Sequence, residues 1–573
     1  MTKFPAIGRF VGLSLLFFFF ISVRPSLANV RLSGIFGSHM VLEQDIKIPV
    51  WGWADPGEDV TVTLGDHTAK TKADANGNWR VDLDPEKTTA TPLTLTVTGK
   101  NSLKFDDVLI GDVWICSGQS NMEFSFKWGP HNAVTELPKA DEPQLRLFNV
   151  IKNISLKPVT DLKGEWKVCS PTSVVDFSAV GYFFGRELCH SLNRPIGLIS
   201  APWSGLPAQS FISLSALQKA PSFGNYTSNY GYIADKYPKD KEAYPAILAE
   251  WQAKWKQWNE TVIPAYNQSL KQWQTAADQA KASGQPAPPK PTPPTPNFKY
   301  PNGPYVEPST PTVIYNGMIA PLIPYAFKGV IWYQGESNGG KIAYENGFIF
   351  ADESNAYKGG EYQTLFPRLI SDWREKWNQG DFPFLYVQLA NFTKPQVEPS
   401  EGGWAYLREA QLKTLALPNT GMAVIIDIGD PNSIHPKDKL DVGLRLALAA
   451  KHVAYGQDIV YSGPIYDSMT VEGNKIRLTF KDTGSGLQMS APPWTPTGVV
   501  APAPTELTGF AIAGADKKWV WAKAQIDGNT VVVSSDQVAA PVAVRYGWAS
   551  NPACDLYNKE GLPASPFRTD NWP

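Results

Sequence analysis

Ser120 is the first residue whose setting points to chemistry. It follows an apolar run, Val113–Cys116, that gives way abruptly to small and polar residues. A buried parallel strand ends in this way at the carboxyl edge of its sheet, where open α/β sheets bind their ligands. The alternative is a strand followed by an ordinary polar turn. Because a serine hydroxyl becomes a good nucleophile only when a base removes its proton, the rest of the chain has to supply that base.

His435 is the histidine best placed to be the base. It lies in the loop 427–436, between the last predicted strand and the last predicted helix, at the same sheet edge as Ser120. The amino terminus of the adjoining helix disfavours a charged imidazolium and so favours the neutral ring that can accept a proton. A structural role is favoured for the other histidines, because none has a matching partner: His39, His67, His131, His190 and His452.

Two further strand ends supply donors for an oxyanion. The apolar run Gly329–Tyr333 ends at Gln334, whose amide can donate a hydrogen bond without carrying a charge. The run Ile196–Ser200 is followed by Gly205, where the missing side chain lets a backbone N–H approach the same oxygen. Nucleophile, base and oxyanion donors thus come from separate strand ends that converge on one rim.

Alternating strands and helices have to position these groups. Segments with helical periodicity lie between the apolar runs, and this alternation predicts a parallel sheet covered by helices on both faces. The predicted strands are Val113–Cys116, Ile196–Ser200, Gly329–Tyr333, Phe384–Leu389 and Met422–Ile428, and the predicted helices are Ala179–Leu192, Tyr362–Trp377, Ala405–Leu417 and Lys437–Tyr455.

Regions rich in predicted β-strands flank this α/β segment. At 573 residues the chain is too long for one hydrophobic core. Short strand-like runs separated by turn residues predict β-sandwich-type domains at 29–108 and 458–573, on either side of an α/β domain at 109–457. An insertion at about 213–308, helical and then proline-rich, interrupts the α/β domain. It is interpreted as a lid or side wall, or as a surface embellishment.

Composition and the amino terminus restrict the compartment and the partners. A net charge of -2 argues against nucleic acid or an anionic membrane surface as partner. Residues 1–28 combine a positive start, a short apolar core and small residues, which predicts a cleaved secretory signal and a secreted or periplasmic protein without a membrane anchor. The four cysteines lack metal-ligand spacing and permit up to two disulfides, although Cys116 is better interpreted as a buried free thiol.

Several sequence blocks resemble those of the sialate O-acetylesterase family, within the SGNH-type hydrolases. These blocks lie at 118–122, 332–338 and 434–436, with further similarity at 40–44, 51–54 and 558–570. The resemblance covers nearly all of the chain after the signal, apart from the insertion. It implies a three-layer α/β/α SGNH-hydrolase-like domain and a serine esterase that removes acetyl groups from sugars. It further implies Ser120 as nucleophile, His435 as general base and then acid, and Gly205 and Gln334 as the oxyanion hole, with no metal or cofactor.

The chain departs from the family pattern in two places. SGNH hydrolases commonly carry an aspartate three residues before the histidine, and that residue is Asn432 here. Asp430 is near enough to substitute and complete a triad; otherwise a backbone carbonyl near Ser433 orients the ring in a Ser-His dyad. Where many relatives have two glycines, this chain has Ser204 and then Gly205, which leaves open the backbone N–H that faces the oxyanion.

Other functions compete with this interpretation. Glu336 and Asp430 could form the carboxylate pair of a glycosidase, but Ser120 and His435 would then have no purpose. The alternative that is not an enzyme is a non-catalytic carbohydrate-binding protein. Within the esterase interpretation, O-acetylated sialic acid, acetylated xylan and other decorated glycans all fit as substrates. The sequence leaves the oligomeric state open.

Overall fold

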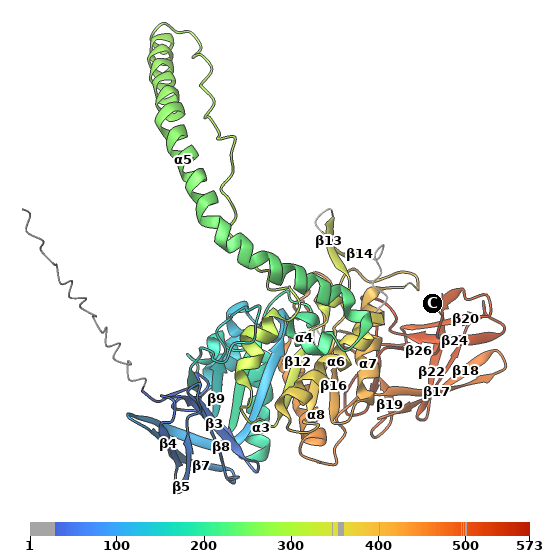
Figure 1. Cartoon of the computed structure of the whole chain (residues 1–573). Helices are drawn as coiled ribbons and strands as arrows, with labels where there is room; N and C mark the ends of the chain where they lie inside the picture. The colour runs from blue at the N-terminus through green and yellow to red at the C-terminus, as the bar shows by residue number, and fades with distance from the viewer. Residues whose placement is uncertain are drawn as a thin grey trace, which may run out of the picture.

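The computed structural model describes residues 29–345, 348–352, 360–399, 401–493, 495–496, 498 and 501–572. Its α/β body lies between an N-terminal and a C-terminal region of β-strands, and a long helix rises from the body (Figure 1). The predicted secretory signal at 1–28 lies outside the described residues.

A largely parallel sheet forms the centre of the body. Its strand order is β10-β9-β11-β8-β12-β15-β16, in which β10 runs antiparallel to β9 and the other neighbours are parallel. The bounds are β8 Ser102–Gly118, β9 Glu142–Asn149, β10 Trp166–Cys169, β11 Ile196–Pro202, β12 Gly329–Tyr333, β15 Phe384–Gln388 and β16 Thr420–Val424. The predicted α/β class is therefore confirmed, and β9 and β10 are strands that the sequence did not reveal.

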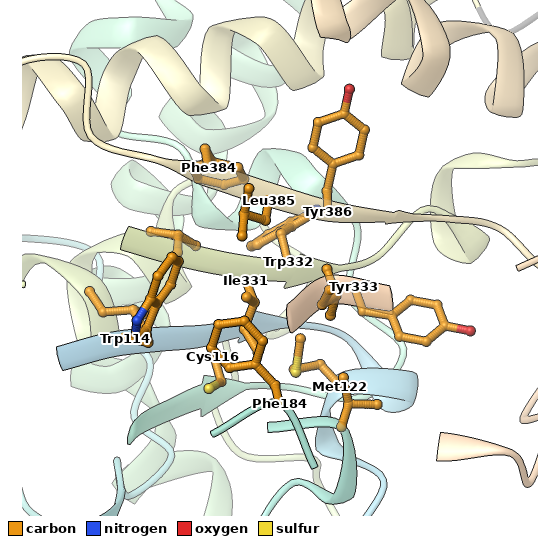
Figure 2. Packing of buried hydrophobic residues seen from close by; sticks show 14 of the residues in the cluster. Trp114, Cys116, Met122, Phe184, Ile331, Trp332, Tyr333, Phe384, Leu385 and Tyr386 are labelled. Atoms are coloured by element: carbon orange, nitrogen blue, oxygen red, sulfur yellow. The ribbon is translucent and has the colours of Figure 1, made fainter. Parts of the chain in front are cut away.

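Helices cover both faces of this sheet. α3 (Ala179–Leu192) packs with α8 (Lys439–Val453), and α6 (Gly360–Trp377) packs with α7 (Gly403–Lys413). On one face, the Trp114 ring of β8 meets Phe184 of α3 with centroids 5.0 Å apart. On the other face, Trp332 of β12 meets Trp373 of α6 at 6.1 Å. Figure 2 shows Trp114 and Trp332 pointing to opposite sides of the sheet.

The carboxyl end of β8 lies at the centre of the sheet. Gly118 is in register with Pro202 of β11 on one side and with Tyr333 of β12 on the other. Because β11 and β12 lie on opposite sides of β8, the chain changes direction across the sheet at this point, which is where α/β sheets leave room for a ligand. The loops that follow these three strands therefore meet at one edge.

The N-terminal strands are joined to the body through β8. The first half of β8 pairs antiparallel with β7, and its middle pairs with β2, so the strand continues through position 108 into the central sheet. The strands of this region are β1 Arg31–Leu32, β2 Val41–Glu43, β3 Ile48–Trp53, β4 Asp59–Leu64, β5 His67–Lys72, β6 Asn78–Leu83 and β7 Thr89–Thr98.

The C-terminal strands contact the body through buried polar groups. The Tyr557 hydroxyl donates to Asp427 at 3.2 Å, and the Arg408 guanidinium donates to the carbonyls of Ala549 and Ser550 at 2.6 and 2.9 Å. The strands are β17 Ile465–Glu472, β18 Lys475–Lys481, β19 Leu487–Met489, β20 Phe510–Gly514, β21 Trp519–Trp521, β22 Lys523–Asp527, β23 Thr530–Ser534, β24 Pro541–Tyr546, β25 Leu556–Asn558 and β26 Phe567–Arg568.

The insertion begins with α4 (Leu214–Leu217) and continues as the 59-residue helix α5 (Gly224–Ala282). Figure 1 shows α5 rising away from the body with the extended, proline-rich segment 284–304 returning beside it. Trp273 of α5 donates to the Pro288 carbonyl at 2.8 Å, and Trp251 packs edge-on against Tyr300. Aromatic side chains along α5 therefore hold the returning segment. A row of aromatic residues also recurs every seventh residue along α5, and its first member, Tyr230, donates to the Leu156 carbonyl of the body instead. The row is Tyr230, Tyr237, Tyr244, Trp251 and Trp258.

The four cysteines all lie in the described ranges, where each is a buried free thiol. The expectation for Cys116 is confirmed, and burial raises the pKa of its thiol. The two disulfides that the sequence permits do not form among these residues. Along the described residues, no helix combines the length and the apolar character needed to cross a membrane.

Candidate active site

Ser120 begins the short helix α1 (Ser120–Glu123) directly after β8. The turn into this helix needs Gly118, whose φ is +136° and whose added Cβ would lie 2.2 Å from the Tyr333 carbonyl oxygen. The Ser120 side chain is 6% exposed, and within the described part of the chain its hydroxyl has no hydrogen-bond partner. The hydroxyl is thus held at the sheet edge without being committed to the protein.

Asn121 links the Ser120 helix to the loop that carries His435. Its side-chain amide donates to the Ile434 carbonyl at 3.0 Å and to a carboxylate oxygen of Glu336 at 2.5 Å. Ile434 precedes His435 directly, and Glu336 follows the end of β12. One buried amide therefore fixes three loops relative to one another: the serine loop, the histidine loop and the β12 loop.

Lys439 sets the orientation of that amide. Its ammonium group donates to Asn121 Oδ1 at 2.6 Å, which leaves the NH₂ group of Asn121 to face Ile434 and Glu336. Lys439 is completely buried, and its Nζ lies 4.7 Å from the centroid of the Phe124 ring. Burial lowers the pKa of Lys439 to about 7 and raises the pKa of the Glu336 carboxyl. The network therefore contains two ionisable side chains, and burial disfavours the charged form of each.

His435 is half-buried beside this network. Its ring packs edge-on against Trp128 with centroids 5.8 Å apart, and its backbone N–H donates to the Ser433 hydroxyl at 3.2 Å. Burial, and to a lesser extent the positive charge of Lys439, lowers the pKa of His435 to about 4. The ring is consequently neutral at neutral pH and can accept a proton. No hydrogen bond to the ring is found among the residues described.

Asp430 lies in the same loop but points elsewhere. Its carboxylate accepts from the backbone N–H of Asn432 at 2.8 Å, which closes a local turn. In the described structure no hydrogen bond joins Asp430 to His435, and Asn432 is exposed. The loops that carry Ser120 and His435 are thus joined through Asn121, whereas the Asp430 carboxylate is bonded within its own turn.

The Gly205 loop is attached to the other end of α1. One carboxylate oxygen of Glu123 accepts from the backbone N–H and the hydroxyl of Ser204, at 2.7 and 2.6 Å, and the other pairs with Lys152 at 2.6 Å. The N–H of Ser204 is therefore occupied. Gly205, at φ +74° and exposed, has no hydrogen bond from its N–H within the described residues, so this donor is available.

Gln334 lies behind the Gly205 loop. Its side chain is completely buried, and its NH₂ group donates to Asn338 at 2.8 Å and to the Leu206 carbonyl at 3.4 Å. The Tyr362 hydroxyl donates to its amide oxygen at 3.0 Å. In this arrangement Gln334 braces the chain next to Gly205, and its amide would have to leave these partners to reach an oxyanion.

The sequence did not reveal the groups that join the loops: Asn121, Glu123, Glu336 and Lys439. Asn121 and Glu336 lie inside the motif blocks, but a block alone does not tell a reacting side chain from a bracing one. Lys439 looks like an ordinary residue in the first turn of a helix. Its complete burial, which is rare for a lysine, is the signal that only the structure provides.

Known proteins are similar to this chain over almost its whole length. No protein-family model matches the sequence. A carbohydrate acetylesterase of known structure from Xanthomonas citri is 36% identical, with a TM-score of 0.70 over 95% of this chain and 100% of that one. The sialate O-acetylesterase of Rattus norvegicus is 28% identical over 98% of both chains, and that of Homo sapiens is 28% identical over 95% of this chain and 93% of its own.

The similarity covers almost all of this chain and almost all of each of these proteins. The resemblance first seen in short blocks is therefore confirmed along the full length. The chain belongs to the sialate O-acetylesterase family of carbohydrate acetylesterases, and it is a carboxylic ester hydrolase.

Proposed function

We propose that this esterase is exported and removes acetyl groups from sugars, with Ser120 as nucleophile and His435 as general base on an SGNH-type three-layer domain. The hydrogen bond from the Asn121 amide to the Ile434 carbonyl carries the proposal, because Asn121 follows Ser120 directly and Ile434 directly precedes His435. The unbonded serine hydroxyl and the neutral imidazole of the loop joined to it are the two groups that acyl transfer requires. The export part of the proposal rests on the sequence of residues 1–28.

The reaction proceeds in two steps. His435 takes the proton of Ser120 as its Oγ attacks the acetyl carbonyl, and the resulting alkoxide is stabilised by the N–H groups of Gly205 and Ser120. When the C–O bond to the sugar breaks, His435 returns the proton to the sugar oxygen. Water, deprotonated by the same ring, then attacks the acetyl-enzyme, and acetate leaves as Ser120 regains its proton.

A Ser-His dyad fits this site better than a triad with Asp430. The Asp430 carboxylate is engaged by the N–H of Asn432, whereas the His435 backbone is held through the Ser433 hydroxyl and the Ile434 carbonyl. The orientation of the ring would then follow from the loop and from its contact with Trp128. Asp430 would shape the loop.

The burial of Glu336 does not fit the role of the general acid of a glycosidase. The Glu336 side chain is 3% exposed and one of its oxygens is bonded to Asn121. A general acid for glycoside cleavage must reach the glycosidic oxygen in an open cleft. Glu336 therefore serves the bracing network.

Acetate release from acetylated xylan, acetylated pectin and O-acetylated sialosides tests the proposal and ranks the substrates. We expect acetate from at least one of these carbohydrates and no new reducing ends. Release of reducing ends without acetate would overturn the esterase assignment for these glycans. The family name alone does not decide between sialosides and plant polysaccharides.

Replacing Glu123 with alanine is expected to lower kcat about 10²-fold, because the loop carrying Gly205 loses its attachment to α1 and small displacements of catalytic donors are costly. Steady-state hydrolysis of p-nitrophenyl acetate measures the effect. Ser204→Ala is the matched control, since it removes one hydroxyl but keeps the backbone N–H bonded to Glu123. Equal kcat in Glu123→Ala and wild type would mean that this attachment does not position the donor.

A further inference from the structure

The insertion carries a hollow of about 850 Å³ between α5 and its returning segment. Three tyrosines line it, Tyr244 from the helix and Tyr300 and Tyr305 from the return. The side chains of Tyr300 and Tyr305 are 59% and 63% exposed, which is unusual for large aromatic rings on a soluble protein. We call this hollow the tyrosine pocket.

Two of its three rings, those of Tyr244 and Tyr300, are held in place by contacts within the insertion. Tyr300 packs edge-on against Trp251 with centroids 4.8 Å apart. The Tyr244 hydroxyl donates to the Pro301 carbonyl at 3.3 Å, and the backbone at Gly303 lies so close that an added Cβ would be 3.3 Å from the Tyr244 ring. A ligand would therefore meet preorganised aromatic faces, which reduces the entropy lost on binding.

Polar side chains around the rings match the chemistry of a sugar. Asp240, Asn302 and Glu307 line the pocket and offer oxygen acceptors and amide donors to hydroxyl groups. The tyrosine rings offer flat apolar surfaces, as the C–H faces of a pyranose require.

The charges of the pocket favour a neutral ligand. Its lining contains one cation, Lys236, and two carboxylates, Asp240 and Glu307. Lys236 is paired with Asp240 one helical turn away, so Glu307 leaves the pocket with a net negative charge. A uronate or a sialic acid would be repelled, whereas an uncharged chain would not.

The pocket is attached to the loops around Ser120. The returning segment re-enters the body at Thr312, whose N–H donates to the Gln209 carbonyl at 3.0 Å. The Gln209 side chain accepts from Asn338 at 3.1 Å, and Asn338 also binds Gln334 and the N–H of Ala208. The whole insertion also leaves and re-enters the body between β11 and β12, whose carboxyl ends flank Ser120.

We propose that the tyrosine pocket is a secondary binding site for neutral polysaccharide chains, which holds a polymeric substrate while Ser120 acts on an acetyl group elsewhere along it. The proposal rests on the proposed carbohydrate deacetylation, and it narrows the substrate class to neutral glycans. Small esters bypass the site.

Isothermal titration of the full chain with deacetylated hexasaccharides tests the pocket. The probes are xylohexaose, cellohexaose and mannohexaose as neutral chains and hexagalacturonate as an acidic one. At least one neutral chain is expected to bind, and Tyr300→Ala and Tyr305→Ala are each expected to weaken that binding about tenfold or more. The KM for the matching acetylated polymer should rise in parallel while kcat is retained.

Tyr232→Ala is the matched control, since Tyr232 is a 66% exposed tyrosine of the same helix outside the pocket, and its loss should leave binding unchanged. Tyr305→Ala removes a largely exposed ring, so thermal melting should match wild type. Unchanged affinity in Tyr305→Ala, absence of binding by every neutral chain, or tighter binding of hexagalacturonate would each refute the site. Wild-type hydrolysis of p-nitrophenyl acetate reports separately on the proposed catalytic function.

Discussion

Ser120→Ala is expected to lower kcat for p-nitrophenyl acetate by about 10⁴-fold or more, and His435→Ala by a similar factor, because nucleophile and base act as one unit. The double variant should be no worse than either single one. Both side chains lie at the edge of the sheet and contribute few contacts to the folded structure, since the Ser120 hydroxyl bonds to no described residue. The loss should therefore appear without a change in thermal stability.

Two further variants sharpen this test. Ser117→Ala removes a buried hydroxyl of the same strand that donates to the Ala201 carbonyl at 2.9 Å, and it should keep most of the activity. Asp430→Asn should change kcat by less than about fivefold if the site is a dyad, whereas a triad aspartate would cost about 10⁴-fold. Full activity in Ser120→Ala would end the serine mechanism.

Lys439→Met is expected to move the acidic limb of kcat/KM upward in pH and to destabilise the protein. In the wild type the base must be deprotonated, and the pKa of His435 is about 4, so activity should be lost only as the pH falls through that value. Removing the lysine charge raises the pKa of His435 toward its usual value. Activity at pH 5 should then fall more than activity at pH 8, while burial of the ring keeps part of the shift.

The stability effect of Lys439→Met follows from the unpaired amide. Asn121 Oδ1 would lose its donor in a buried setting, which lowers the free energy of unfolding by about 1–3 kcal/mol. Lys451→Met at the other end of α8 breaks the ion pair with Glu187 and should leave the pH limb in place. A pH profile of Lys439→Met that overlays the wild type would show that Lys439 does not tune the base.

The sequence predicted most of the α/β body, since its buried strands and amphipathic helices have clear periods. The helix Ala179–Leu192 and the strand Gly329–Tyr333 agree with the structure to the residue. The predicted strand Met422–Ile428 is shorter in the structure, as Thr420–Val424, because an apolar run continues into a buried loop. β9 escaped notice because it opens with Glu142, Pro143 and Gln144.

The site was predicted only in part, for a physical reason. The proposed reacting residues follow the ends of strands, and strand ends can be predicted from hydrophobic runs in the sequence. Bracing groups act through tertiary contacts, and neither the burial of Lys439 nor its bond to Asn121 has a local pattern. For Gln334 the sequence pattern predicts a role that the side-chain contacts do not support. Its position at a strand end predicts a donor to the oxyanion, whereas its amide donates to Asn338 and to the Leu206 carbonyl.

The single strand β8 makes the N-terminal region a mechanical support for catalysis. Its amino-terminal half is hydrogen-bonded to β7 and its carboxyl end leads directly to Ser120, the proposed nucleophile, so both sheets have to be intact to hold Ser120 in place. Truncating the chain at residue 109 would remove about half of β8 and leave strand edges without hydrogen-bond partners, which promotes aggregation. A minimal catalytic fragment of this esterase therefore has to include β2 and β7, the N-terminal strands that pair with β8.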